Sequence, residues 1–414
     1  MTDMAGTVPV IAVDKVQAVA LAVCTYYFGV WLKGKVGVLS RYSIPSPVVG
    51  GMSFAIVVSF LEYFNIVKVQ IDSTLQTVLM LGFFTTIGLM ASLRVVKDGG
   101  RLLLGFLLAV TVLVFLQNGM GMAIAEAMGF DKHYGILAGS VSMMGGLGTA
   151  AAFGPYFEET YGITGGTAVA VTAATFGMVA ALLIGGPFGE WCIRRYKVKT
   201  PDEVQQPEPE LHLPDDMDTD ITEQHASAKP NFTNEIMRAV SVTALAMGLG
   251  MIVSNFLGHY ITLPAYIGAM IIATIIRNVG DFSGMYKVEG KGLNAVADIT
   301  LVLFVTMAIN NLKLHELVHL ALPLVVILAC QTILMLIYAW TVLFTAFGRS
   351  YDAVMLSVGG IGFSMGATAN GLANMQAISE KYGSSPRAWL IVSVVGAFLI
   401  DLINAVVITW FGTL

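Results

Sequence analysis

The sequence MMGGLGTA, at residues 143–150, has a counterpart in GGIGFSMGATAN, at residues 359–370. Each stretch follows a long apolar run and precedes a Tyr-Gly pair, at residues 161–162 and 382–383, after which another apolar run begins. Backbone N–H and C=O groups without hydrogen-bond partners cost free energy inside lipid. Two interruptions of the apolar runs at matching positions are therefore expected to serve a function. We expect the two stretches to form a substrate-binding site.

The composition indicates an integral membrane protein. Of the 414 residues, 56% are hydrophobic and only 12% are charged, and the mean hydropathy is +0.77. The apolar runs are about 17 to 25 residues long, which is typical of membrane helices and not of the strands of an outer-membrane barrel. The sequence predicts an all-α polytopic protein with ten spans, near residues 14–33, 44–66, 75–92, 101–128, 164–189, 236–257, 261–279, 293–312, 316–347 and 388–411.

The distribution of basic residues predicts the orientation. The N-terminal segment has no Lys or Arg before its first apolar residues, which argues against a cleavable signal sequence. With the N-terminus outside, 18 of the 22 Lys and Arg residues fall on the cytoplasmic side, and only Lys15, Lys68, Lys132 and Lys313 fall outside. We therefore expect a multi-pass protein of the cell inner membrane with both termini outside, in the periplasm.

A polar stretch separates the two halves of the chain. Residues 201–235 contain ten acidic residues against one Lys, together with five prolines, and this composition cannot bury a core. We expect residues 194–235 to be an acidic cytoplasmic linker between a first repeat, residues 1–193, and a second repeat, residues 236–414. The three cysteines, Cys24, Cys192 and Cys330, suggest neither a disulfide framework nor a metal cluster.

The repeat extends beyond the glycines. SIPSPVVGGM from Ser43 is echoed by TLPAYIGAM from Thr262, FFTTIGLMASL from Phe83 by FVTMAINNLKL from Phe304, and EETYG by SEKYG. Each half has five spans, an odd number, so the second half must be inserted upside down relative to the first. This is an inverted-topology repeat, the architecture of many secondary transporters.

The topology places the glycine stretches inside the membrane. Residues 133–160 must begin and end outside, and residues 350–385 must begin and end inside, so both are expected to be re-entrant hairpins that meet near the midplane. Helix N-termini at such a site attract carboxylates, and freed backbone carbonyls suit a small cation.

Close helix packing is the structural alternative for any single glycine, but repetition in register with hydroxyls and amides favours a site. The GxGxxxG pattern from Gly360 does not indicate a nucleotide-binding motif, because no predicted strand-turn-helix unit surrounds it. The candidate substrate-binding residues are Gly145, Gly146, Gly148, Thr149, Ser364, Gly366, Ala367, Thr368, Asn370 and Asn374.

Asp401 lies deep in the last span, and Asn404 shares its helix face. A carboxylate there is costly and usually functional, so we expect Asp401 and Asn404 to bind a coupling cation, Na+. The alternative is a structural hydrogen bond that holds the last helix. Asp298 lies nearer the start of its span, and its role is left open.

Several longer motifs together resemble the bacterial sodium/glutamate symporter family, among them YSIPSPVVGGM, LQNGMGMA, LAGSVSMMGGLGTAAAF, GATANGLANMQAISEKYG and VVGAFLIDLINAVVI. The resemblance covers nearly the whole chain. It implies a sodium-coupled glutamate importer with two five-helix inverted repeats and two re-entrant loops, and a homodimer that works by an elevator-like movement. The hairpins differ from the family pattern at Leu147, Ala150 and Asn370, where the family usually has His, Gly and Thr.

The sequence thus predicts a transporter and not an enzyme, with Na+ as coupling ion, a small anionic substrate, the lipid bilayer as its surroundings and no nucleic-acid partner. Two alternatives remain within transport: a sodium-coupled carrier of another small carboxylate, such as a dicarboxylate or hydroxycarboxylate, and a channel.

Overall fold

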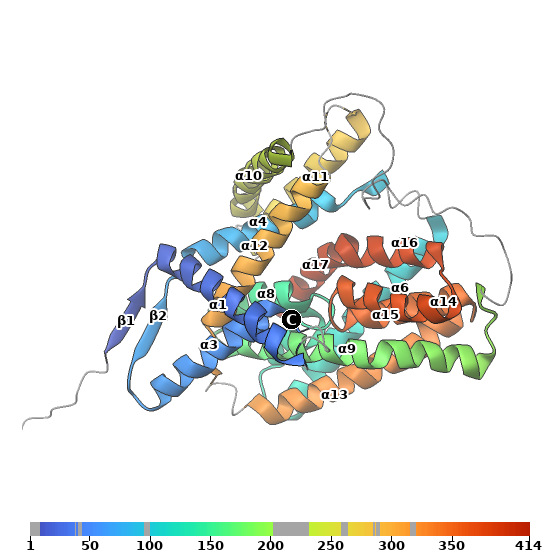
Figure 1. Ribbon diagram of the computed structural model, residues 1–414, viewed down its shortest axis with the longest axis horizontal. Coiled ribbons are helices and arrows are strands. Elements are labelled where there is room, and N and C mark those ends of the chain that lie inside the picture. The colour runs from blue at the N-terminus through green and yellow to red at the C-terminus, as the bar shows by residue number, and fades with distance from the viewer. Residues whose placement is uncertain are drawn as a thin grey trace, which may run out of the picture.

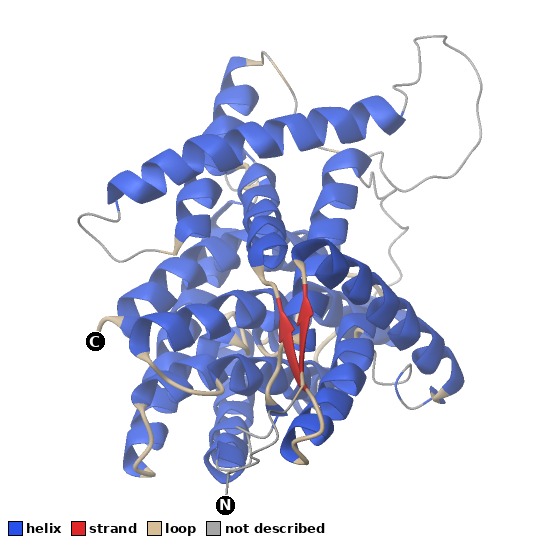
Figure 2. Cartoon of the chain, turned by 90° about the vertical axis from the view of Figure 1, so that its left-hand side faces the viewer, coloured by secondary structure: helices blue, strands red, loops and turns tan. Residues whose placement is uncertain are grey.

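The structure is a computed structural model, and it describes residues 9–37, 39, 44–94, 100–201, 232–257, 264–284, 286, 290–314 and 320–414. Most of the predicted acidic linker, residues 202–231, lies outside the described residues. The described part is almost entirely helical, as Figures 1 and 2 show.

The described part of the first half contains five long helices and three shorter helical segments. Its elements are β1 (Val10–Val13), α1 (Lys15–Lys35), α3 (Ser46–Tyr63), β2 (Lys68–Ile71), α4 (Thr74–Met90), α6 (Gly100–Ala127), α7 (Lys132–Ile136), the π-helical segment η1 (Leu137–Val141), α8 (Gly146–Tyr161) and α9 (Gly166–Tyr196). Asp14 begins α1 as a capping residue, because its carboxylate accepts hydrogen bonds from Val16 N and Gln17 N at 2.8 and 2.9 Å.

The second half is also built of long and short helical segments. Its elements are α10 (Phe232–Leu257), α11 (Ala265–Ser283), α12 (Lys291–Asn310), α13 (Ala321–Tyr338), the π-helical segment η4 (Ala339–Ala346), α14 (Tyr351–Ser364), α15 (Thr368–Tyr382), α16 (Pro386–Val394), the π-helical segment η5 (Val395–Leu399) and α17 (Ile400–Gly412). The last three run on from one another as one long span.

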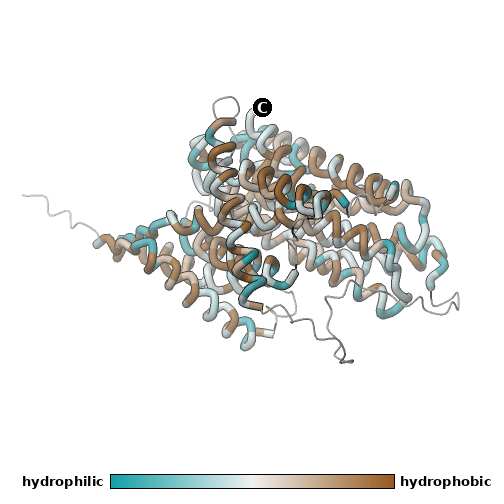
Figure 3. Tube along the Cα trace, turned by 90° about the horizontal axis from the view of Figure 1, so that it is seen from above, coloured by the Kyte–Doolittle hydropathy of each residue, from teal (hydrophilic) through white to brown (hydrophobic). Residues whose placement is uncertain are grey.

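A helix lies at each of the ten predicted spans. Among the described residues, eight helices are long and apolar enough to cross a membrane. The other two are α4, an apolar helix of 17 residues, and α11, which carries Arg277, Asn278 and Asp281 in its last turns. Figure 3 shows hydrophobic residues along the helices throughout the molecule.

The helices pack in two groups that each draw on both halves of the chain. The six-helix group comprises α1, α3, α4, α10, α11 and α12, and the hairpin group comprises α6 to α9 and α13 to α17. In Figure 1 the first group lies at the left and top and the second at the right. Contacts between the groups are few, and the largest is between α12 and α8. The boundary between the groups is therefore the natural place for a cavity.

Small residues allow the closest helix contacts within each group. A Cβ atom built on Gly50 would lie 1.8 Å from the Thr25 carbonyl oxygen, and one built on Gly121 would lie 2.1 Å from that of Gly135. Because lipid tails are as apolar as Leu side chains, such close packing is a main source of helix association in a membrane.

The strands β1 and β2 form a two-stranded parallel sheet with Val10 opposite Lys68 and Val13 opposite Ile71. It ties the segment before α1 to the loop between α3 and α4, at one end of the six-helix group (Figure 2).

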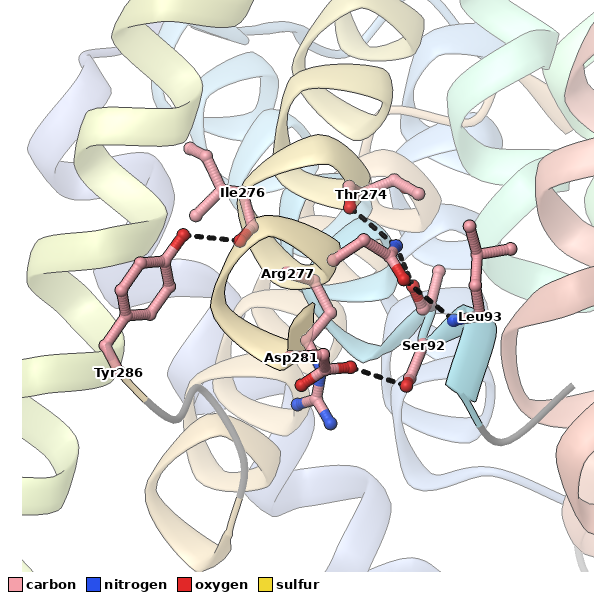
Figure 4. A network of polar contacts seen from close by, with 9 residues as sticks. Ser92, Leu93, Thr274, Ile276, Arg277, Asp281 and Tyr286 are labelled. Atoms are coloured by element: carbon pink, nitrogen blue, oxygen red, sulfur yellow. Dashed lines mark hydrogen bonds and ion pairs between the residues drawn. The ribbon is translucent and has the colours of Figure 1, made fainter. Parts of the chain in front are cut away.

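A buried polar network joins the end of α4 to α11 (Figure 4). The Asn278 side chain accepts a hydrogen bond from Leu93 N at 2.8 Å and donates to Ala91 O at 2.9 Å, so it satisfies backbone groups beyond the last turn of α4. Asp281 pairs with Arg277 Nε at 3.0 Å and accepts a hydrogen bond from the Ser92 hydroxyl at 2.5 Å. This network fixes α4, from the first half, against α11, from the second.

Replacing Asn278 by alanine is expected to destabilise the protein by about 1 to 3 kcal/mol, because it removes these bonds and leaves the carbonyl of the buried Ala91 unpaired. Thermal unfolding of the purified protein measures the effect. Asn294→Ala is the control, since Asn294 is exposed on α12, and it should unfold like the wild type. Equal melting temperatures for Asn278→Ala and Asn294→Ala would contradict the assigned role.

Candidate functional site

A cavity of about 520 Å³ lies where the two groups meet. Both glycine stretches reach it: the first contributes Met144 to Thr149, and the second contributes Gly366 to Ala369. The six-helix group supplies the opposite wall, mainly from apolar residues of α4 and α12 such as Phe83, Ile87 and Leu301.

The first glycine stretch covers most of the break between η1 and α8, at residues 142–145, and the first turn of α8. Gly139 has non-helical angles (φ −90°, ψ −129°), so the chain kinks there, and Ser140 O accepts hydrogen bonds from the Met144 and Gly145 amides at 3.2 and 2.9 Å. The Ser142 hydroxyl lies 2.7 Å from Ala170 O and so fixes the break to α9. The helix α8 then begins at Gly146 without a side-chain cap.

The second glycine stretch contains the break at residues 365–367, between α14 and α15. The Thr368 hydroxyl donates to Gly396 O at 2.5 Å, which fixes the start of α15 to the π-helical segment η5. Two amides hold α15 against α9: Asn370 Nδ2 donates to Met178 O at 2.9 Å, and Asn374 Nδ2 donates to Ala181 O at 3.0 Å. The helix α15 also begins without a side-chain cap.

The two breaks touch each other. A Cβ atom on Gly146 would lie 2.5 Å from Gly366 O, and Gly146 has φ +62°, a conformation that glycine adopts without strain. As a result, the first turns of α8 and α15 both border the cavity. The first N–H groups of a helix have no intrahelical partner, so two uncapped N-termini at one cavity can bind carboxylates.

Two carboxylates line the cavity from opposite walls. Asp401 lies on α17 in the hairpin group, and Asp298 lies on α12 in the six-helix group. In the described part of the chain, no hydrogen bond or ion pair joins either carboxylate to another side chain, and no Lys or Arg lines the cavity. A cation would therefore find oxygen ligands and negative charge here, from Asp401 together with Thr368 and the irregular backbone of η5.

The sequence comparisons agree with one another. A sequence model of the sodium/glutamate symporter family matches residues 11–384. The sodium/glutamate symporter of Escherichia coli K12 is 37% identical over 400 residues, which cover 95% of this chain and 96% of the relative. The chain belongs to the sodium/glutamate symporter family. The sodium/glutamate symporter of Haemophilus influenzae is 35% identical over 395 residues, 94% of this chain and 95% of that protein. The family is one of transporters and not of enzymes, and the apolar helices of this member make it a multi-pass protein of the inner membrane.

In this symporter family member, eight of the predicted site residues line the cavity: Gly145, Gly146, Gly148, Thr149, Gly366, Ala367, Thr368 and Asp401. Ser364, Asn370, Asn374 and Asn404 are buried behind it. Asn404 Nδ2 donates to Ser140 O at 3.1 Å, so its amide joins α17 to η1 instead of facing the cavity.

The wall formed by the six-helix group was not predicted from the sequence. Phe83, Ile87 and Leu301 lie within predicted spans and carry no polar group that would mark them, although the echo between the segments from Phe83 and Phe304 is a signal that points to this wall. Asp298, whose role the sequence left open, lies here.

Proposed function

We propose that this chain is a sodium-coupled secondary active importer of glutamate. The observation that carries the proposal is the cavity between the two helix groups. It combines two helix N-termini that lack side-chain caps with a carboxylate, Asp401, that has no hydrogen bond or ion pair to a described side chain. The chain also aligns along nearly its whole length with relatives named sodium/glutamate symporter.

The substrate carboxylates bind the free N–H groups at the starts of α8 and α15, together with the hydroxyls of Thr149 and Thr368. Asp401 supplies negative charge for Na+ or for the substrate ammonium. Asn370 and Asn374 hold α15 in place, because their amides are bonded to α9.

Transport proceeds by alternating access in this proposal. The two halves form an inverted repeat, residues 133–160 and 350–385 are re-entrant hairpins, and the hairpin group moves as a unit against the six-helix group, as in an elevator. The small number of contacts between the groups supports this division, and so does the apolar wall of α4 and α12, which offers few polar bonds to break. Both termini then face outward and the acidic linker faces the cytoplasm, in keeping with the basic residues. The proposal also includes a homodimer.

A carrier of another small carboxylate is the second candidate. The cavity favours it in one respect, because no Lys or Arg lies among its described lining residues. Backbone N–H groups and hydroxyls bind a carboxylate, but they discriminate weakly between substrates that differ in the rest of the molecule.

Counterflow of labelled glutamate in proteoliposomes tests the proposal, with and without Na+ and with a panel of unlabelled carboxylates. We expect counterflow that requires Na+ and that glutamate itself inhibits most strongly. Glutamate and Na+ should raise each other's affinity by the same factor. A glutamate affinity independent of Na+ would contradict the coupling, and stronger competition by a dicarboxylate would favour the second candidate.

A further inference from the structure

A buried cluster of six polar side chains lies inside the hairpin group, behind the cavity. We call it the amide cluster, and it consists of Gln117, Asn118, Ser140, Gln331, Ser364 and Asn404. These residues come from α6, η1, α13, α14 and α17, and each is at least 99% buried. No residue of the amide cluster lines the cavity.

Hydrogen bonds join the cluster residues in two sets of three, which meet at the neighbouring residues Gln117 and Asn118 of α6, and they fix the orientation of each amide. Gln117 Nε2 donates to Ser364 O at 2.9 Å, and Gln331 Nε2 donates to Gln117 O at 2.7 Å. Asn404 Nδ2 donates to Ser140 O at 3.1 Å, and Asn118 Oδ1 accepts from Ser140 N at 2.9 Å. Because a carbonyl cannot donate and an N–H cannot accept, none of these amides can be turned over without losing its bond.

The cluster holds an unusual share of orphaned polar atoms. Of the twelve buried side-chain polar atoms without a hydrogen-bond partner among the described residues, six belong to it. Five of the six are oxygens, and they are Gln117 Oε1, Ser140 Oγ, Gln331 Oε1, Ser364 Oγ and Asn404 Oδ1. Buried polar groups are almost always paired, so such a concentration calls for an explanation, and a bound ion or water would provide one.

The balance of donors and acceptors favours a cation as the ligand. The three amide oxygens can only accept, whereas the cluster has a single orphaned N–H donor group, Asn118 Nδ2, besides its two hydroxyls. Neutral amide, hydroxyl and backbone oxygens are the ligands of a small hard cation, as in transporter and channel ion sites. Asp401 lies three residues before Asn404 on α17, and residues at this spacing are neighbours on a helix surface. Its negative charge thus stands between the cluster and the cavity.

We infer that the amide cluster is a binding site for Na+, distinct from the cavity and built from neutral oxygens of both halves of the chain. This inference rests on the proposed function, because it places a coupling ion within the sodium-coupled carrier.

The site explains how an ion can control substrate binding without touching the substrate. Ser364 lies two residues before Gly366, and Ser140 O holds the Met144 and Gly145 amides that begin the first glycine stretch. Na+ at the amide cluster would therefore order both breaks, and with them the two helix N-termini that face the cavity.

The test uses two variants that remove an orphaned hydroxyl and no hydrogen bond of the protein, Ser140→Ala and Ser364→Ala. The melting temperature of the purified protein is measured against Na+ concentration, with choline as the replacement cation and without glutamate. We expect each variant to need about tenfold more Na+ for half-maximal stabilisation, the effect of losing one oxygen ligand to a charge. In choline alone neither variant should melt below the wild type, because the lost hydroxyl is unpaired.

Ser357→Ala is the matched control. Ser357 is fully buried on the same helix as Ser364, but its hydroxyl is already bonded to Ala353 O at 2.7 Å. We expect wild-type Na+ dependence for this variant. If Ser140→Ala or Ser364→Ala cannot be purified in a folded state, Ser140→Cys or Ser364→Cys takes its place and should show the same loss, since soft sulfur is a poor ligand for Na+.

If both hydroxyl variants keep the wild-type Na+ dependence, the cluster holds water only and the inference is overturned. This outcome is separable from a failure of the proposed function. Wild-type proteoliposomes that take up glutamate without any need for Na+ would contradict sodium coupling, whereas Na+-dependent uptake with unchanged Na+ affinity in the variants would contradict the amide cluster site alone.

Discussion

Replacing Asp401 by asparagine is expected to lower the apparent Na+ affinity of glutamate uptake by about 100-fold or more. The asparagine side chain has nearly the same shape, so the change removes charge and little else. Asp401 lines the cavity from α17 without an ion pair or hydrogen bond to any described side chain, and its negative charge is therefore available to a cation. Removing one partner of a desolvated charge pair costs about 2 to 5 kcal/mol, which corresponds to this loss of affinity.

Initial rates of labelled glutamate uptake into proteoliposomes, measured against Na+ concentration, give the result. Glu126→Gln is the control, because it neutralises an exposed carboxylate near the end of α6 in the same helix group, and it should keep wild-type Na+ dependence. Wild-type dependence for Asp401→Asn would rule out a role in coupling. A loss of glutamate affinity at saturating Na+, with unchanged Na+ affinity, would assign Asp401 to the substrate ammonium instead.

The positions of the helices follow from the sequence, because hydropathy and run length are local properties. Each of the ten predicted spans contains a helix, and the breaks occur at residues 142–145 and 365–367, which overlap the two glycine stretches. The meeting of both stretches at one cavity was also predicted, since the expected topology brings them together. These features need no knowledge of which helix packs on which.

The division into two helix groups does not follow from the sequence. It depends on close approaches between residues far apart in the chain, such as Gly185 against Asn374, where an added Cβ would lie 2.1 Å from Nδ2. Sequence spacing also cannot decide which side of a helix faces the cavity. Asp401 and Asn404 share a helix face, yet one lines the cavity and the other bonds to Ser140 in the amide cluster.

The amide cluster shows a further limit of sequence analysis. The Gln117-Asn118 pair and Gln331 stand out as polar residues inside apolar runs, but interhelical hydrogen bonds would explain them equally well. Only the unpaired oxygens, which depend on the contacts of five separate elements, distinguish an ion site from a structural network.

Replacing Gly146 by alanine is expected to weaken glutamate binding by roughly 30-fold or more. Gly146 has φ +62°, and this left-handed conformation costs a residue with a side chain about 1 to 2 kcal/mol. The new Cβ would also lie 2.5 Å from Gly366 O, so the two glycine stretches must separate. Separation displaces both helix N-termini at once, and the substrate carboxylates lose donors from each.

Binding of labelled glutamate to the purified protein at saturating Na+ measures this effect directly. Gly186→Ala is the control, because Gly186 lies inside α9 with no atom within 4 Å of an added Cβ, and an alanine there should leave binding unchanged. Alanine favours a helix over glycine, so Gly186→Ala should also be as stable as the wild type or more stable. If Gly146→Ala bound glutamate as tightly as Gly186→Ala, contact between the two stretches could not be what forms the site, and substrate recognition would have to lie with one hairpin alone.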